Sequence, residues 1–476
     1  MSKDGGSSRR AGELAQPSCS MVGLGSLLLE TEGSFAVVIH GDADCINPFL
    51  KVFPHRLAPD VGRMRLSSDR FHVTGLTEPE VISGGGRERL LRCIETAVEQ
   101  QAPEIVFVLG TCLAEMIGED IQGICESAGS RLGLPVIPLR TGGLRLKTQA
   151  ELLDRFGTLL ASPPGTTGHG EGNDAPGGPG ADAAASVPCN RLPTPESEES
   201  QSAGGGIVLL GYPALRPWEW DEVAGLVGAA GGRLAAELPA RSSLAAWQRL
   251  TGADLVAIAD PAFWPDLIAL LERRNVPWVE LPPPVGLQAS HSFYDKLLSH
   301  CPRGGQAAQM LDELSRSTRS FLDSLPATGG LGLSGLRVAY CIGSIKNYVA
   351  GQLAREGLGE LPALLELGCD VEVLIQERED QGARDRVRRN LDLLGVDLPF
   401  RNFNDPGVLG RELTAGKYRL AYCQDHLAGQ ARQAGLAHVR FGALRPGFVG
   451  MVHNARTLQA ALSTGFQGRY GRYLRR

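Results

Sequence analysis

Short apolar runs alternate along this chain with longer stretches in which apolar residues recur at helical spacing. Residues 36–40 and 105–109 are two such runs, and residues 88–100 between them carry leucine, isoleucine and valine about one helical turn apart. Uninterrupted apolar runs of this length are typical of parallel strands covered by helices on both faces. The pattern therefore predicts a strand, a helix and a second strand in the first part of the chain.

The same alternation occurs twice more further along. Because strand–helix alternation favours parallel sheets with right-handed crossovers, we predict an α/β protein with three Rossmann-like domains, whose parallel sheets are flanked by helices. The predicted strands span 207–210, 255–259 and 278–281 in the second block, and 337–341, 371–375 and 419–423 in the third. The predicted helices span 218–230 and 265–274 in the second block, and 347–367 in the third.

Two segments interrupt this alternation. Residues 162–206 are rich in Gly, Pro and Ser and have too few apolar side chains to offset the entropy of ordering, so we predict a flexible, disordered insertion. Residues 304–335 are predicted to be a connector, helical around 311–325 and then Gly-rich. The 476 residues allow about three domains of about 150 residues each. We place these domains at 1–161, 207–303 and 336–476.

Net charge and hydropathy indicate which kinds of partner and which cellular compartment to expect. A net charge of −6 favours neither nucleic acid nor an anionic membrane. The sequence shows no apolar run of about 18 residues, and residues 1–16 lack the apolar stretch of a signal peptide. We therefore expect a cytoplasmic protein, in which the ten cysteines are thiols or metal ligands rather than disulfides. Most should pack as small apolar core residues, as we predict for Cys93, Cys125, Cys341, Cys369 and Cys423.

Cys45 and Cys112 are the exceptions, because each lies just beyond the carboxyl end of a predicted strand. In open α/β sheets the ligand crevice lies outside these strand ends. Cys112 also starts a predicted helix, and a helix N-terminus lowers the pKa of a thiol. Thiolates are the usual ligands of iron–sulfur clusters. Position alone leaves two interpretations, a pair of cluster ligands or two buried cysteines.

Three stretches, in chain order, resemble the component-1 subunits of nitrogenase and its relatives. They are residues 40–45 with the sequence His-Gly-x-x-x-Cys, which continue into 51–56; residues 76–78 followed by Gly84 and Gly85; and residues 110–120, the most specific stretch. Residues 277–280, 364–369 and 447–450 are similar to the family more loosely. The family includes molybdenum–iron protein subunits, cofactor-assembly scaffolds and dark-operative protochlorophyllide reductase-like subunits. The resemblance covers the chain apart from the insertion and the extreme termini.

The resemblance implies a [4Fe–4S] cluster in the first domain, shared between subunits. Family members with the full set hold it with three cysteines, of which this chain keeps the first and third as Cys45 and Cys112. Two thiolates do not complete a four-ligand site, so a second copy or a sister subunit is implied. Near the middle position this chain has His72. His72, Asp42 and Asp44 are weaker candidate ligands; alternatively, the aspartates belong to a turn and the histidine is packed.

The resemblance also implies what the chain lacks. Where the family's cofactor cysteine would follow residues 255–259 there is Asp260, and His438 and His453 are off register for its histidine, so we expect no iron–molybdenum cofactor. The sequence has no G-x-x-x-x-G-K-[ST] loop, and the family receives electrons from a separate ATP-dependent reductase, an iron protein. Residues 330–335 match G-x-G-x-x-G but precede their strand, which indicates a linker.

The leading hypothesis is an iron–sulfur oxidoreductase subunit that reduces a small molecule in a cleft between its domains. Candidate residues for that cleft lie at strand ends, although each also suits an ordinary solvated or capping role: Asp260, Lys346, Asn347, Asp425, His426 and Arg445. The alternative is a non-catalytic scaffold subunit that carries a cluster or a metal precursor and hands it on. A third hypothesis is a degenerate partner that binds a small molecule without redox chemistry.

Overall fold

The computed structural model describes residues 24, 28, 31–46, 68–84, 86–142, 149–162, 205–212, 215–239, 243–325, 333–342, 357–376, 382–424 and 427–463. The predicted insertion therefore falls outside the described residues, apart from its two ends. Residues 51–56, Gly85, and the candidate cleft residues Lys346, Asn347, Asp425 and His426 also fall outside them.

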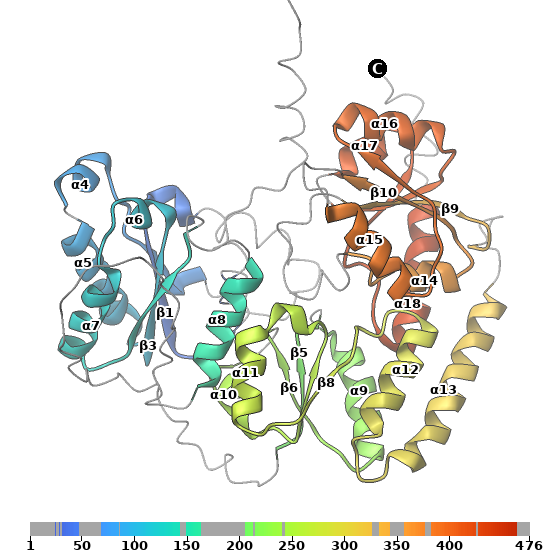
Figure 1. Cartoon of the computed structure of the whole chain (residues 1–476), viewed down its shortest axis with the longest axis horizontal. Coiled ribbons are helices and arrows are strands. Elements are labelled where there is room, and N and C mark those ends of the chain that lie inside the picture. The colour runs from blue at the N-terminus through green and yellow to red at the C-terminus, as the bar shows by residue number, and fades with distance from the viewer. Residues whose placement is uncertain are drawn as a thin grey trace, which may run out of the picture.

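Three parallel sheets form the described part of the chain (Figure 1). The first has the strand order β2 (Phe71–Val73), β1 (Phe35–His40), β3 (Ile105–Gly110) and β4 (Val136–Arg140). All of β1 and β3 is buried, as expected for central strands with both faces covered. The helices of this part are α4 (Glu78–Ser83), α5 (Gly86–Gln101), α6 (Cys112–Met116), α7 (Ile121–Leu132) and α8 (Gln149–Ala161), with η2 (Ala43–Ile46) and η4 (Ser68–Arg70).

Side chains alternate between the two faces of the first sheet. Ala36 and Val38 face the helix layer of α5 and α7, where Leu90, Ile94 and Cys125 pack. The opposite face packs against α8 and continues into the core of the second sheet. Figure 1 shows α8 between the two sheets, and α8 contacts both α10 and α11 of the second sheet.

The second sheet has the order β6 (Leu234–Leu238), β5 (Ile207–Leu210), β7 (Leu255–Ile258) and β8 (Trp278–Glu280). Its helices and turns are α9 (Pro217–Ala229), α10 (Leu244–Arg249), η6 (Leu250–Gly252), η7 (Pro261–Phe263), α11 (Pro265–Arg273), α12 (Leu287–Leu298) and α13 (Gly304–Ser324). The predicted strands and helices of this block are confirmed to within a residue or two.

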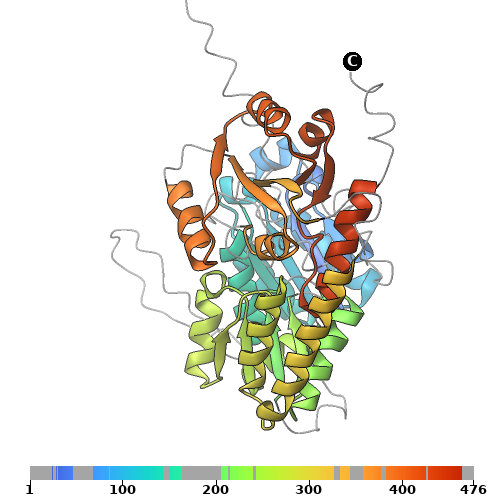
Figure 2. The same ribbon diagram turned by 90° about the vertical axis from the view of Figure 1, so that its right-hand side faces the viewer.

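The third sheet has the order β11 (Phe400–Phe403), β10 (Asp370–Gln376), β9 (Arg337–Ile342), β12 (Leu420–Cys423) and β13 (Ala437–Arg440). Its helices are α14 (Leu361–Glu366), α15 (Gly382–Leu393), α16 (Pro406–Ala415), α17 (Ala428–Gln433) and α18 (Gly447–Ser463). Figure 2 shows α18, in red, lying against α13.

The predicted helix over 347–367 is confirmed in part: of its described residues, 357–360 form a turn and 361–366 form α14. Residues 347–356 lie outside the described residues. The fold class is confirmed: three parallel sheets are flanked by helices. The bounds between domains stay predictions. No helix within the described ranges is both long and apolar enough to cross a membrane.

Candidate functional site

In each sheet there is one point, between two neighbouring strands, at which the order of strand addition reverses. In the first sheet the chain runs through β1, adds β2 on one side, and then crosses to β3 on the other. Ligands of open α/β sheets bind at such a switch point, outside the carboxyl ends of the strands. Cys45 follows β1 and Cys112 follows β3, so the two thiols flank the switch point.

Cys45 lies in the short 3-10 turn η2, whose first hydrogen bonds are local. The backbone N–H of Cys45 donates to the carbonyl oxygen of Asp42 at 3.0 Å. The carboxylate of Asp42 accepts from the N–H of Asp44 at 2.7 Å, which identifies Asp42 as a turn-forming residue. Cys45 is half-buried and packs with Ile46 against the core below, so its side chain is held at the edge of the sheet.

Cys112 is the first residue of α6 and is exposed. The preceding residue, Thr111, is the N-cap and continues the ladder between β1 and β3: its N–H and its hydroxyl both donate to the carbonyl oxygen of His40, at 3.2 and 2.9 Å. Gly41 makes this contact sterically allowed, because a Cβ at position 41 would lie 2.3 Å from the Thr111 hydroxyl oxygen. The start of the Cys112 helix is thus fixed to the start of the Cys45 turn.

A threonine follows three of the four strands of this sheet, and each threonine hydroxyl donates a hydrogen bond to a backbone carbonyl oxygen at the end of the neighbouring strand. The hydroxyl of Thr74, after β2, donates to Gly41 O at 3.2 Å, and that of Thr141, after β4, donates to Gly110 O at 3.0 Å. Each hydroxyl satisfies a carbonyl oxygen at the point where the ladder ends. These threonines were not predicted from the sequence, and only Thr111 comes directly after a continuous apolar strand.

The weaker candidate ligands differ in position. Asp44 is exposed beside Cys45. His72 lies within β2, paired in register with Val38, and its Nε2 is 2.8 Å from Nε2 of Gln101 at the far end of α5. Burial lowers the pKa of His72. Its described contact is therefore with a helix end, away from the strand ends where the two thiols lie.

The two candidate cleft residues within the described ranges, Asp260 and Arg445, each have a partner. Asp260 caps η7 by accepting from the N–H of Ala262 at 3.1 Å. Arg445 is buried in an ion pair with Glu219 of α9, so the expectation that Arg445 lines an open cleft is corrected.

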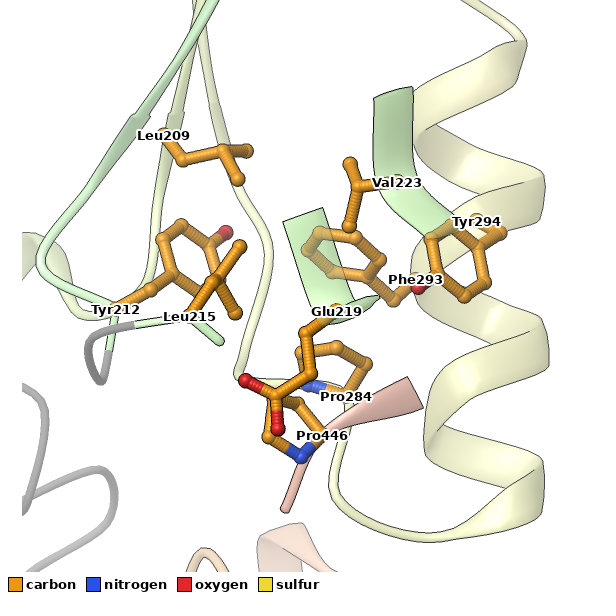
Figure 3. Close-up of a pocket in the computed structure, with 9 residues that line it drawn as sticks. All are labelled: Leu209, Tyr212, Leu215, Glu219, Val223, Pro284, Phe293, Tyr294 and Pro446. Atoms are coloured by element: carbon orange, nitrogen blue, oxygen red, sulfur yellow. The ribbon is translucent and has the colours of Figure 1, made fainter. Parts of the chain in front are cut away.

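A small pocket lies beside this ion pair (Figure 3). It has room for about one water molecule, which is too little for a metal cluster or an organic substrate. The carboxylate of Glu219 points between two prolines, as Figure 3 shows. The lining residues are Leu209, Tyr212, Leu215, Glu219, Val223, Pro284, Phe293, Tyr294 and Pro446.

The other described cysteines are different in kind from Cys112. Cys125, Cys341, Cys369 and Cys423 are buried, as predicted, whereas Cys93 is only partly buried. Burial raises the pKa of Cys125 and of Cys369 to about 12 and that of Cys93 to about 11. These thiols stay protonated near neutral pH, which disfavours metal binding.

The thiol pair suits part of a shared cluster site. Within the described residues no group of three or more His, Cys, Asp or Glu side chains converges to hold a metal. Two soft sulfur ligands, one of them exposed, fit a cluster whose remaining ligands come from another chain. The same end of the sheet exposes two large apolar side chains, Ile82 on α4 (78%) and Met116 on α6 (71%). Figure 1 shows α4 and α6 together at this end.

The described residues thus form a parallel α/β protein with two cysteines at the switch point of its first sheet. Residues 19–392 match the family model described as nitrogenase component 1 type oxidoreductase. The chain belongs to this family.

Individual relatives align over short stretches. The nitrogenase iron-molybdenum cofactor biosynthesis protein NifE of Mesorhizobium japonicum is 39% identical over 72 residues, which are 15% of this chain and 14% of that protein. Subunit N of the light-independent protochlorophyllide reductase of Heliobacterium mobile is 32% identical over 89 residues, 18% of this chain and 20% of that protein. The aligned stretches thus span about a fifth or less of these relatives.

The structural match extends over most of the chain. A solved structure described as nitrogenase Cp1 at pH 6.5 matches with a TM-score of 0.66 at 15% identity, over 96% of this chain and 90% of that one. At this identity the match shows the fold.

Proposed function

We propose that this protein is an iron–sulfur oxidoreductase subunit in which Cys45 and Cys112 hold part of a [4Fe–4S] cluster shared with another subunit. The observation that supports this most strongly is the position of the two thiols on either side of the switch point of the first sheet. A bound cluster supplies one-electron transfer there.

The residues of this chain would bind the cluster, hold the two turns in place and shield one side of the site from water. Cys45 and Cys112 bind iron, the threonines after the strands fix the two turns, and the core below Cys45 keeps water away from one side. The exposed Ile82 and Met116 would be covered by the second subunit, either another copy or a sister chain. A separate ATP-dependent reductase of the iron-protein type would deliver electrons, and a small molecule would be reduced between the domains. We propose a cytoplasmic protein without nucleic acid or membrane as a partner.

A second function is a non-catalytic scaffold for cofactor assembly. The observation in its favour is the similarity to proteins described as NifE, which are named for cofactor biosynthesis. A scaffold would use the same thiols to carry a cluster or a metal precursor and then release it.

Two measurements on the reconstituted protein separate these functions. For the oxidoreductase, a purified ATP-dependent reductase with ATP and dithionite should reduce the cluster, and cell-extract metabolites added afterwards should reoxidise it. For the scaffold, iron labelled with ⁵⁷Fe should move to an added apo-acceptor of the same family. Reoxidation without transfer supports the oxidoreductase, and transfer without reoxidation contradicts it.

A further inference from the structure

We propose that His40 and Glu119 form a positioning pair that holds the two cysteine arms at the spacing required by the cluster. The Cys45 arm is defined as residues 41–46 and the Cys112 arm as residues 111–119. This inference rests on the proposed function, because the pair acts only through these two arms.

The imidazole of His40 connects three segments at the carboxyl edge of the first sheet. His40 ends β1, directly before the Cys45 arm, and its side chain is fully buried. Its Nδ1 lies 3.2 Å from the hydroxyl oxygen of Thr74, after β2, and its Nε2 is hydrogen-bonded to the carboxylate of Glu119. Both ring nitrogens therefore have partners, and the orientation of the ring is fixed.

Glu119 transmits this contact to the Cys112 helix. Its backbone N–H donates to the carbonyl oxygen of Ala114 in α6 at 3.3 Å, and its own carbonyl accepts from the N–H of Ile121 at the start of α7. A displacement of Glu119 would therefore displace α6, whose first residue is Cys112.

The carboxylate of Glu119 is held from the other side by α5. It lies against Gly86, the first residue of that 16-residue helix, where an added Cβ would be 2.5 Å from Oε1. The amino-terminal end of a helix favours a carboxylate. A side chain at position 86 would therefore push Glu119 away from His40.

A buried pair of this kind is weak evidence for stability, because desolvation offsets the attraction between the partners. Its attested use is to specify one geometry. The side chains of His40 and Glu119 are 0% and 11% exposed, so the contact is shielded from water and the geometry is tightly specified. Ligands on separate loops need such support, since a site functions only within about 0.5 Å of its productive geometry.

Two site variants and two control variants test the inference. Glu119→Gln removes the charge and keeps the shape. Gly86→Ala keeps both His40 and Glu119 in the sequence, but its added Cβ displaces the Glu119 carboxylate. Helix propensity alone would make the alanine variant more stable than the wild type. Glu95→Gln is the matched control, because it breaks an exposed pair with Arg131 in the same layer of helices. Val371→Ala, in β10 of the third sheet, controls for a loss of stability far from the site.

The first readout needs no cluster. Nitroxide labels on Cys45 and Cys112, in a background with Cys19, Cys93 and Cys189 replaced by Ser, give a distance distribution by pulsed electron paramagnetic resonance. We expect the distribution to broaden at least twofold in Glu119→Gln and in Gly86→Ala and to stay unchanged in both controls. An unchanged distribution in the first two variants overturns the inference.

The second readout is iron binding by reconstituted protein, which should weaken about 10- to 100-fold in the two site variants. Unchanged iron binding in both would also overturn the inference. If the wild type binds no iron, the proposed function fails, and the distance distribution still decides whether the pair positions the arms.

Discussion

The carboxylate of Glu219 in α9 accepts two hydrogen bonds from the guanidinium of Arg445, which lies 226 residues further along the chain, and both side chains are buried. The Arg445 backbone N–H also donates to Asn454 Oδ1 of α18 at 2.6 Å. These bonds join α9, beside the second sheet, to the segment directly before α18, beside the third sheet.

Arg445→Ala should therefore destabilise the protein strongly. It leaves a buried carboxylate without its cation, which costs about 3–5 kcal/mol in the free energy of unfolding. Denaturant unfolding measures this, with Arg456→Ala, on the same helix as Asn454, as the control. The double variant Glu219→Leu/Arg445→Met should recover most of the loss, because it removes both charges. A double variant no better than Arg445→Ala contradicts this account.

Asp154 makes stability depend on pH. This buried carboxylate on α8 accepts from the N–H groups of Asp266 and Leu267 at 2.8 and 3.0 Å, at the start of α11. Burial nevertheless raises its pKa to about 6, with the neighbouring charge of Asp266 adding to the rise.

Because this pKa is higher folded than unfolded, the folded state binds the proton more tightly. The associated stabilisation is complete below about pH 4 and is lost as the pH rises towards 6, a change of order 3 kcal/mol. Trp247 and Trp264 lie beside α8 at Gly157, so tryptophan fluorescence follows unfolding there. Relative to Asp154→Asn, the wild type should gain stability between pH 7 and pH 5. A constant difference would show that the carboxyl stays ionised.

Thiol chemistry should separate Cys112 from the core cysteines. At pH 8 a thiol with a pKa of about 12 has a thiolate fraction of roughly 10⁻⁴, and burial slows reaction further. Iodoacetamide should therefore modify exposed Cys112 at least about 100-fold faster than Cys125 or Cys369 in native protein, as measured by peptide mass spectrometry. Equal rates would mean that the structure around Cys125 and Cys369 opens readily.

The buried carboxylate of Glu115 should lower the stability of the folded protein, and a substitution can measure this effect. Both of its carboxylate oxygens are shielded from solvent, lie against Gly142 and have no hydrogen-bond partner among the described residues. A buried, unpartnered polar group costs about 1–3 kcal/mol, so Glu115→Met should raise the free energy of unfolding by about that much. Glu119→Met, which removes a carboxylate that has partners, should lower it. A loss of stability in Glu115→Met would indicate that Glu115 has a cationic partner.

The central strands could be predicted because burial on both faces leaves a continuous apolar run, as in β1, β3 and β9. Most edge strands were missed, although the edge strand β8 was predicted. Among those missed, β2 has three residues, β4 contains Pro138 and is only partly buried, and β13 is mostly half-buried. A run that is short or half-polar does not differ from a loop in sequence.

The positions of the two candidate cysteines were predictable to the same extent. Strand ends fix where Cys45 and Cys112 lie, because topology brings the carboxyl ends of parallel strands to one edge. The contact between His40 and Glu119 spans 79 residues, and the ion pair of Arg445 spans 226. Such contacts depend on how helices pack, which local patterns do not specify.

Cys45 and Cys112 are the residues that we propose to bind an iron–sulfur cluster. The most direct test is the iron and acid-labile sulfide content, with electron paramagnetic resonance, of anaerobically purified and reconstituted wild type, Cys45→Ala and Cys112→Ala, with Cys125→Ala as the control. We predict about four irons per pair of subunits in the wild type and in the control, and loss of the cluster in both site variants. A wild type without iron after reconstitution, or a cluster that survives in both site variants, would contradict this account.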